Sequence, residues 1–228
     1  MRRASVPRRT PATSVPKVTT IGGLEHAPAD FLTALGALRR ARVRRELALH
    51  EIPAPSRLAP FAVALGADVT ASGPTMTPVH GPARLALSSD DAPELAHGRF
   101  ILLHDPDGSP VWDGHFRIVT YIRAELESEM GNDQMLGSVA WTWLQEALAD
   151  HGAAFRQAGG TATRILSESY GSLADRPDAV DIELRASWTP AEADVTDHLE
   201  AWSDMVCTFA GLPPLPEGVT SLPGRRLT

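Results

Sequence analysis

Two stretches of this sequence alternate strictly between the two sides of an extended chain. In residues 116–126 and again in residues 180–188, every second side chain is apolar or small, and most of those between are polar or charged. A period of two is typical of a β-strand that has one face in the core and the other in water. The chain is therefore expected to build a sheet with one covered face and one charged face.

Three segments show the 3.6-residue apolar period of amphipathic helices. The first begins near Pro28, the second follows Asn132 and Asp133 and ends near Gly152, and the third ends at Gly211. Proline in the first turn and glycine after the last turn are frequent at such helix ends. Core packing is expected for Trp143, Trp188 and Trp202, and Trp141 is expected to be more exposed.

The sequence also predicts where the third helix starts, where the first hairpin turns and where the remaining strands lie. The third helix starts either at a capping box, Thr189, Pro190 and Glu192, or at Asp194. Residues 105–108, with the sequence Asp-Pro-Asp-Gly, predict the hairpin turn that joins a strand at 99–104 to the strand at 116–126. The remaining strands are expected at 46–52, at 58–70, where a helix fits nearly as well, and at 161–170 and 179–188.

This order of elements predicts an α+β domain over residues 25–216. Hairpin-linked strands interrupted by helices favour an antiparallel sheet of about five strands with the helices packed on one face. The topology is similar to that of type III secretion chaperones and related small adaptor folds. Because folds do not determine functions, this likeness predicts the architecture alone.

The ends of the chain differ in composition from the domain. Residues 1–24 carry five basic and no acidic residues and are expected to form a disordered basic tail, and residues 217–228 form a second tail. Residues 71–98 are rich in glycine and proline and predict a long surface loop. The whole chain has a net charge of −7, so residues 25–228 carry −12, which makes nucleic-acid binding by the folded domain unlikely on electrostatic grounds.

Location follows from cysteine usage and apolar runs. The single cysteine, Cys207, allows no intramolecular disulfide and suits a reducing cytosol. The longest uncharged apolar run, residues 59–67, is far shorter than the ~20 residues of a membrane-spanning helix. A cytoplasmic protein with no membrane span is therefore expected.

The polar side of the predicted sheet is the first candidate site. Oppositely charged side chains on neighbouring strands can form salt-bridged rows that are simply solvated, or a surface for a partner or an anionic ligand. Tyrosine and arginine are enriched at interfaces, so their presence on this face supports the hypothesis of a binding surface. The candidate binding residues are Arg117, Tyr121, Arg123, Glu125, Arg164, Glu168 and Arg185.

A second candidate site lies in the first hairpin. His104, Asp107, Asp113 and His115 provide imidazole and carboxylate groups within twelve residues, which could hold a divalent metal. The same residue types are also what a tight turn requires, and their spacing matches no calcium-binding loop. The sequence therefore predicts a turn, with metal binding as the alternative.

Catalytic motifs give no further lead. His151 and Cys207 could form a nucleophile pair, but the sequence offers no residue to orient the base, so a helix end and a buried thiol are the favoured explanation. The sequence contains no phosphate loop, dinucleotide fingerprint, zinc-binding helix motif or hydrolase elbow. No cofactor is predicted, and an enzyme is the less favoured class.

Three stretches carry a family resemblance: residues 51–60, residues 98–126, and residues 186–190 together with 210–216. They resemble an actinobacterial family, the domain-of-unknown-function family number three thousand, over most of residues 28–216. The resemblance implies a cytoplasmic protein, and genes of this family often lie near a ribonuclease D-like exonuclease.

Three functions are compatible with these observations. The favoured hypothesis is a non-enzymatic cytoplasmic binding or adaptor protein that uses the charged sheet face to bind an unidentified protein partner or a second copy of itself. The first alternative is an enzyme with a site, metal-assisted or not, near residues 104–115. The second alternative is an accessory factor in RNA metabolism.

Overall fold

The computed structural model describes residues 27–71, 93–126 and 133–212. Both predicted tails, and most of the loop predicted at 71–98, lie outside these residues. Strand β3 begins at Glu94, so the last five residues of the predicted loop are strand instead. The inward positions of this part are Ala96 and Gly98, which are too small to show the alternation of apolar and polar residues seen in the rest of the strand.

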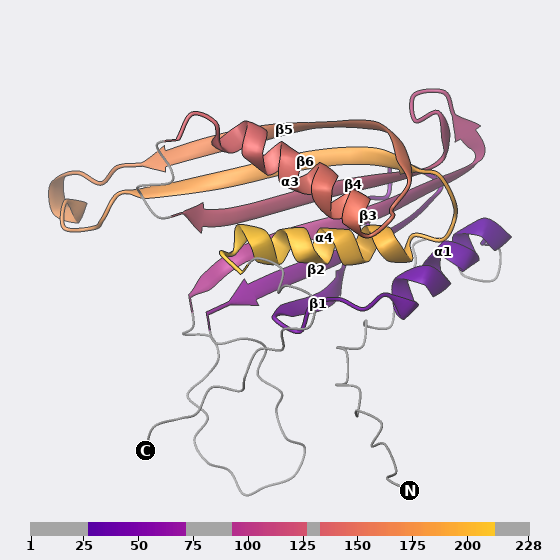
Figure 1. Cartoon of the computed structure of the whole chain (residues 1–228), viewed down its shortest axis with the longest axis horizontal. Coiled ribbons are helices and arrows are strands. Elements are labelled where there is room, and N and C mark those ends of the chain that lie inside the picture. The colour runs from indigo at the N-terminus through magenta and orange to yellow at the C-terminus, as the bar shows by residue number, and fades with distance from the viewer. Residues whose placement is uncertain (1–26, 72–92, 127–132, 213–228) are drawn as a thin grey trace, which may run out of the picture.

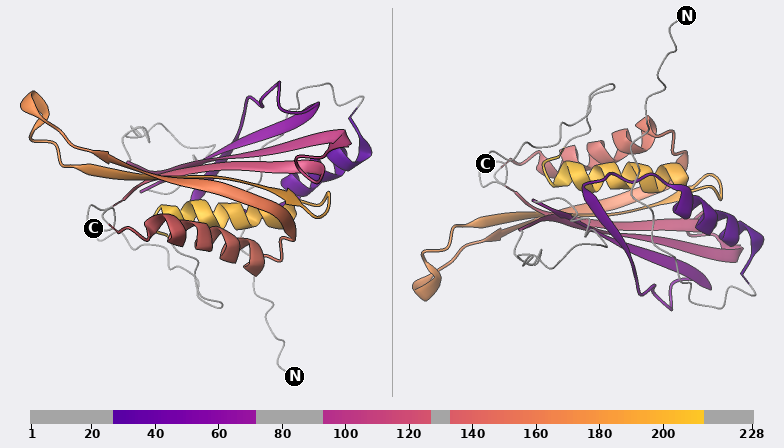
Figure 2. Two further views of the ribbon diagram at one scale, coloured as in Figure 1. Left: turned by 90° about the horizontal axis from the view of Figure 1, so that it is seen from above. Right: turned by 90° about the horizontal axis from the view of Figure 1, so that it is seen from below.

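Six antiparallel strands form one open sheet with the order β1-β2-β3-β4-β6-β5. Three helices, α1, α3 and α4, cover one face of it, as Figure 2 shows. The fold class is thus α+β as predicted, with six strands in place of about five. The element bounds are α1 Ala29–Arg40, β1 Leu47–Ile52, β2 Phe61–Thr70, β3 Glu94–Ser109, β4 Gly114–Leu126, α3 Leu136–Asp150, β5 Phe155–Ser167, β6 Ala179–Pro190 and α4 Thr196–Phe209, with a short 3₁₀ turn at Gly171–Leu173.

The core lies between the helices and the covered face of the sheet. Helix α4 crosses β1 to β4, α3 lies beside it over β5 and β6, and α1 packs against α4 (Figure 1). Phe100, Trp188 and Trp202 are fully buried there. Trp202 packs directly on Gly98, where a Cβ atom would lie 2.7 Å from its ring, so the helix can approach the sheet only because residue 98 lacks a side chain.

The alternation of β4 and β6 is confirmed. Along β4 the buried side chains are those with even numbers, Phe116 to Ala124, and those between them are partly or fully exposed. Trp188 and Leu184 of β6 face the same core. The period of two in these segments therefore reports on the covered and uncovered faces of the sheet.

Two predicted boundaries are wrong, and one of the two alternative starts of the third helix is observed. The first hairpin turns at residues 110–113 and not at 105–108, because β3 and β4 continue past an irregularity and pair again at Ser109 and Gly114. Strand β5 starts at Phe155, earlier than predicted. The capping box at Thr189 is not used, since that residue ends strand β6, and the rival start is observed: the Asp194 carboxylate accepts hydrogen bonds from the Thr196 backbone and hydroxyl at 3.1 and 2.6 Å.

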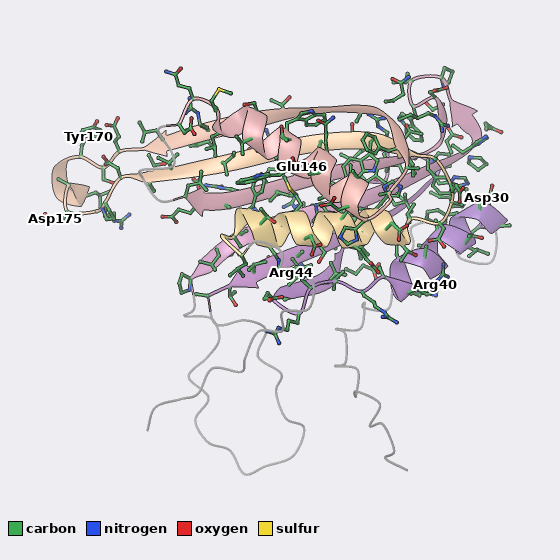
Figure 3. All side chains as sticks on the ribbon, viewed as in Figure 1. Asp30, Arg40, Arg44, Glu146, Tyr170 and Asp175 are labelled. Atoms are coloured by element: carbon green, nitrogen blue, oxygen red, sulfur yellow. The ribbon has the colours of Figure 1, made fainter. Side chains whose placement is uncertain are left out.

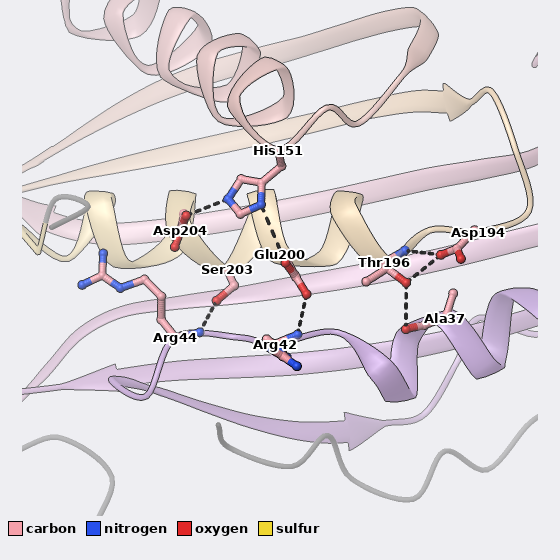
Figure 4. Close-up of polar contacts among 9 residues, drawn as sticks. All are labelled: Ala37, Arg42, Arg44, His151, Asp194, Thr196, Glu200, Ser203 and Asp204. Carbon is pink, nitrogen blue, oxygen red and sulfur yellow. Dashed lines mark hydrogen bonds and ion pairs between the residues drawn. The ribbon is translucent and has the colours of Figure 1, made fainter. Parts of the chain in front are cut away.

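A polar seam joins α4 to the segment between α1 and β1, as Figure 4 shows. The backbone N–H groups of Arg42 and Arg44 donate to Glu200 Oε1 at 2.7 Å and to Ser203 Oγ at 2.9 Å. These bonds satisfy the backbone donors of a segment that follows a helix and precedes a strand. The seam therefore fixes the segment between α1 and β1 to the last helix.

Candidate functional site

The second face of the sheet carries no helix among the described residues (Figure 2), and it is hollowed. A hollow of about 580 Å³ lies over the centre of strands β3, β4 and β6 and reaches β5. We call it the central groove. Its floor and rim include Arg99, Ile101, Val119, Tyr121, Arg185 and Ser187.

The middle of the central groove is a row of three side chains on adjacent strands. Arg99 of β3 stands opposite Tyr121 of β4, which stands opposite Arg185 of β6. The Arg185 guanidinium lies over the Tyr121 ring, with Cζ 5.4 Å from the ring centroid. Side chains directly opposite in antiparallel strands are close neighbours, so the tyrosine is flanked by an arginine on each side.

Acidic residues neutralise Arg123 and Arg185 on this face. Glu183 accepts hydrogen bonds from Tyr121 Oη at 2.9 Å and from Arg185 at 2.6 Å. Asp181 accepts a hydrogen bond from Arg123 at 2.7 Å, and the hydrogen bond and ion pair raise the pKa of that guanidinium. Arg99 differs from both, because its side chain is exposed and makes no hydrogen bond or ion pair within the part of the chain that the structure describes.

A second hollow of about 510 Å³ adjoins the central groove on the side of β1 and β2. Arg99 and His97 line both hollows and so stand at their junction. His97 Nδ1 lies 2.8 Å from Glu94, and its ring lies 5.7 Å from that of Tyr121. The His50 ring covers Gly66 in the second hollow, where a Cβ atom would lie 2.5 Å from Nε2.

Two titratable groups on the uncovered face, Tyr121 and Arg117, have shifted pKa values. Burial, together with the hydrogen bond to Glu183, raises the pKa of Tyr121 above its usual value. Burial lowers the pKa of Arg117, which remains a cation and donates to Ser187 Oγ at 2.7 Å and to the Gln157 carbonyl at 2.8 Å. The groove thus presents hydrogen-bond donors and positive charge beside an aromatic ring.

The comparisons with known proteins identify the family and nothing closer. A family model described as "protein of unknown function (DUF3000)" matches residues 27–220. The chain belongs to the DUF3000 family. No curated protein and no solved structure matches the chain. Within the described part of this DUF3000 protein, no helix has both the length and the apolar character that a membrane crossing requires.

Most of the predicted binding residues of this DUF3000 protein share the uncovered face. Arg117, Tyr121, Arg123 and Glu125 alternate along β4, and Arg185 stands beside Tyr121. The structure therefore brings five of the seven candidates onto one surface.

Two candidates lie elsewhere. Arg164 is opposite Ile182, a core residue, so its side chain is on the helix-covered side, where it donates to the Asp133 carbonyl at 2.8 Å. Glu168 follows the end of β5 in the connection to β6, residues 168–178, which we call the arm and which carries Tyr170 and Asp175 away from the groove (Figure 3). Neither residue belongs to the central groove.

The hairpin candidates for metal binding do not converge. His104 is buried, with its ring stacked 4.3 Å from that of Phe116, and burial lowers its pKa. His115 Nδ1 lies 3.1 Å from the Pro106 carbonyl, and Asp113 pairs with Arg156 at 3.3 Å. The Asp107 N–H donates to the Asp105 carboxylate, as in an Asx turn. Among the described residues no three histidine, cysteine, aspartate or glutamate side chains are placed to hold a metal ion.

The possible nucleophile pair is also explained structurally. His151 Nε2 lies 2.8 Å from Asp204, at the end of α3 where it meets α4 (Figure 4). Burial raises the pKa of Cys207 to about 12, so its thiol stays protonated near neutral pH. Cys207 therefore lacks the thiolate character of a catalytic cysteine.

Sequence reasoning missed two residues of the site, His97 and Arg99. Both lie at the boundary between the predicted loop, residues 71–98, and the predicted strand, residues 99–104. For this reason the sequence analysis did not place them on the polar face. The signal was present in the alternation of His97, Arg99 and Ile101 with Gly98 and Phe100. Extending the period of two backwards through the small residues would have placed both on the uncovered face.

Proposed function

We propose that this DUF3000 protein is a non-enzymatic binding protein, an adaptor, whose central groove receives an acidic segment of a protein partner. The observation that supports this most directly is the state of Arg99. It is exposed at the junction of two hollows and has no partner among the described residues, whereas Arg117, Arg123 and Arg185 on the same face are all bonded.

A carboxylate suits this position chemically. Guanidinium groups present a planar fork of donors that matches carboxylate oxygens, and such charge-assisted bonds are stronger than neutral ones. Tyr121 and Ile101 provide apolar area beside Arg99 for the rest of a peptide segment. Tyrosine and arginine at the centre of a patch are also the side chains that most often dominate binding energy.

The protonation states favour binding over catalysis. A general base needs a pKa near the working pH, whereas the raised pKa of Tyr121 keeps this phenol protonated. Its hydroxyl donates a hydrogen bond to Glu183, which also accepts one from Arg185. These groups serve to position the arginine rather than to accept a proton from a substrate.

We further infer that the protein acts in the cytoplasm of an actinobacterium. The single cysteine, buried in α4, suits a reducing compartment. Lys17 is the one lysine among 21 basic residues, a preference for arginine that fits a GC-rich genome. The likeness to secretion chaperones is likewise an expectation at the level of fold.

Fluorescence anisotropy with a labelled decaglutamate peptide tests the proposed function. We expect binding that weakens with added salt, and about a tenfold loss of affinity in Arg99→Ala, the size expected for one charge-assisted hydrogen bond. Arg176→Ala is the matched control, because Arg176 is an exposed arginine on the arm, away from the groove.

Two results would contradict the proposal. If Arg99→Ala and Arg176→Ala bind the peptide equally, the central groove is not the site. If a labelled decauridylate RNA binds in an Arg99-dependent manner and decaglutamate does not, the RNA-associated alternative replaces the adaptor function.

A further inference from the structure

The two edges of the sheet are strands β1 and β5, and they differ in how they are protected. β1 has six residues, which include His50 and Glu51. β5 lies along the outer edge of the sheet with no element beside it (Figure 1). Edge strands that are long and uncharged leave a row of backbone donors and acceptors open to another strand.

The outer edge of β5 is regular over nine residues. From Gly159 to Ser167 it pairs with β6 without interruption, and the irregularity of the strand lies before Gly159. Within the described residues, no backbone group other than those of β6 bonds to this stretch. It contains no proline or lysine, and its one charged residue, Arg164, is turned to the helix side by its bond to Asp133.

We propose that two copies of this chain pair through their β5 edges, antiparallel about a two-fold axis at Thr163, to form one twelve-stranded sheet. An antiparallel strand pair is the arrangement in which a strand can meet its own copy with the same patch on both sides. Thr163 is the middle of the regular stretch, so this register pairs all nine residues. The proposal is independent of what the central groove binds.

On the uncovered face this register brings together compatible side chains. Thr163 meets the partner's Thr163, and Thr161 meets the partner's Ile165. Threonine pairs and pairs of β-branched residues are favourable cross-strand neighbours. No charged side chain is added to this face of the new strand pair.

On the helix-covered side the register covers an exposed leucine. Gly160 meets the partner's Leu166, and the Leu166 side chain is 60% exposed in the single chain. Trp141 of α3 lies over Gly160, where a Cβ atom would come within 2.8 Å of its ring. The leucine of each copy would therefore lie beside the tryptophan of the other, which removes apolar surface from water.

The charges on the helix-covered side do not oppose pairing. Arg164 meets the partner's Ala162, so the two arginines are not opposite each other. Like charges directly opposite would disfavour the pair. The register therefore combines full backbone pairing with the absence of a direct repulsion.

Sedimentation velocity of the full chain is the first test. We expect a dimer at protein concentrations of tens of micromolar. A monomer at every concentration up to that range overturns the proposal, and so does a dimer that Thr163→Lys leaves unchanged. The lysine variant is expected to fold, because residue 163 lies opposite Glu183 on β6, and to weaken the dimer by about fivefold or more through like charges at the axis. Thr33→Lys, on α1, is the control.

Cysteine cross-linking tests the register. In Thr163→Cys the two new thiols face each other at the Cα separation of about 5 Å that opposite residues have, which suits a disulfide. In the control Thr161→Cys the two thiols are displaced by four residues, roughly 14 Å along the strands, which is too far. The native Cys207 is fully buried and does not interfere.

We expect mild oxidation to convert Thr163→Cys to a covalent dimer at least tenfold faster than Thr161→Cys. Equal rates would show random collision and overturn the proposed register. Circular dichroism of each variant confirms that the fold is retained, so that loss of pairing is not confused with unfolding.

Discussion

His198 should make the stability of this protein depend on pH. The residue is 3% exposed, and burial lowers its pKa to about 4 from a usual value of 6.5. Its Nδ1 accepts a hydrogen bond from Trp188 Nε1 at 3.1 Å, so the neutral ring carries its proton on Nε2. Protonation of Nδ1 would place two donors face to face in the core.

The sign and size of the effect follow from the two pKa values. Between pH 6.5 and 4 the unfolded chain binds a proton that the folded chain excludes, so stability falls as pH is lowered. The stabilising contribution is complete above pH 6.5 and is lost progressively toward pH 4. From pH 7.5 to 4.5 the loss is about 2.5 kcal/mol for this one group.

Urea unfolding at pH 7.5 and 4.5 measures this loss. His198→Asn is the comparison, because its side-chain oxygen can still accept from Trp188 while the group does not titrate. The variant should be less stable at pH 7.5, and its free energy of unfolding should fall by about 2.5 kcal/mol less than that of the wild type. If the two proteins lose stability in parallel, His198 does not titrate as its burial implies.

Three further substitutions test the packing and the uncovered face. Gly98→Ala should lower the free energy of unfolding by about 1–3 kcal/mol, measured by thermal denaturation, because the new methyl group meets Trp202. Ser203→Ala should cost about 1–3 kcal/mol in urea unfolding, since it leaves a partly buried backbone N–H without its acceptor. By contrast, Arg123→Ala combined with Arg185→Ala should change stability by less than about 1 kcal/mol, because both guanidinium groups are 40% or more exposed. A larger loss on calorimetry would make these arginines structural.

The alternation of β4 and β6 could be predicted because one face of each strand is in the core and the other is not. That contrast forces polar and apolar residues into separate positions. In the edge strand β5, side chains on both faces are largely exposed, so polar and apolar residues are not separated by position. The sequence therefore places Arg164 on the wrong face. The prediction of a turn at residues 105–108 failed for a different reason. The sequence Asp-Pro-Asp-Gly favours a turn locally, but β3 and β4 pair again after it, at Ser109 and Gly114.

The central groove was predicted in part, for a related reason. Tyr121 and Arg185 stand on strands with clear alternation, whereas Arg99 stands on a strand whose first inward residues are alanine and glycine. Because alanine and glycine are also frequent in loops, the alternation of residues 96–101 is a weak local signal for a strand. Their placement follows from the packing of Trp202 on Gly98, a contact between residues far apart in the sequence.

The polar seam has a consequence for biosynthesis. Arg42 and Arg44 bind side chains that follow 158 and 159 residues later, so the start of the domain acquires these partners only after helix α4 has been translated. A nascent chain that ends before α4 presents the apolar face of β1 to β4 uncovered. Productive folding of this domain should therefore begin only when the last helix has left the exit tunnel of the ribosome.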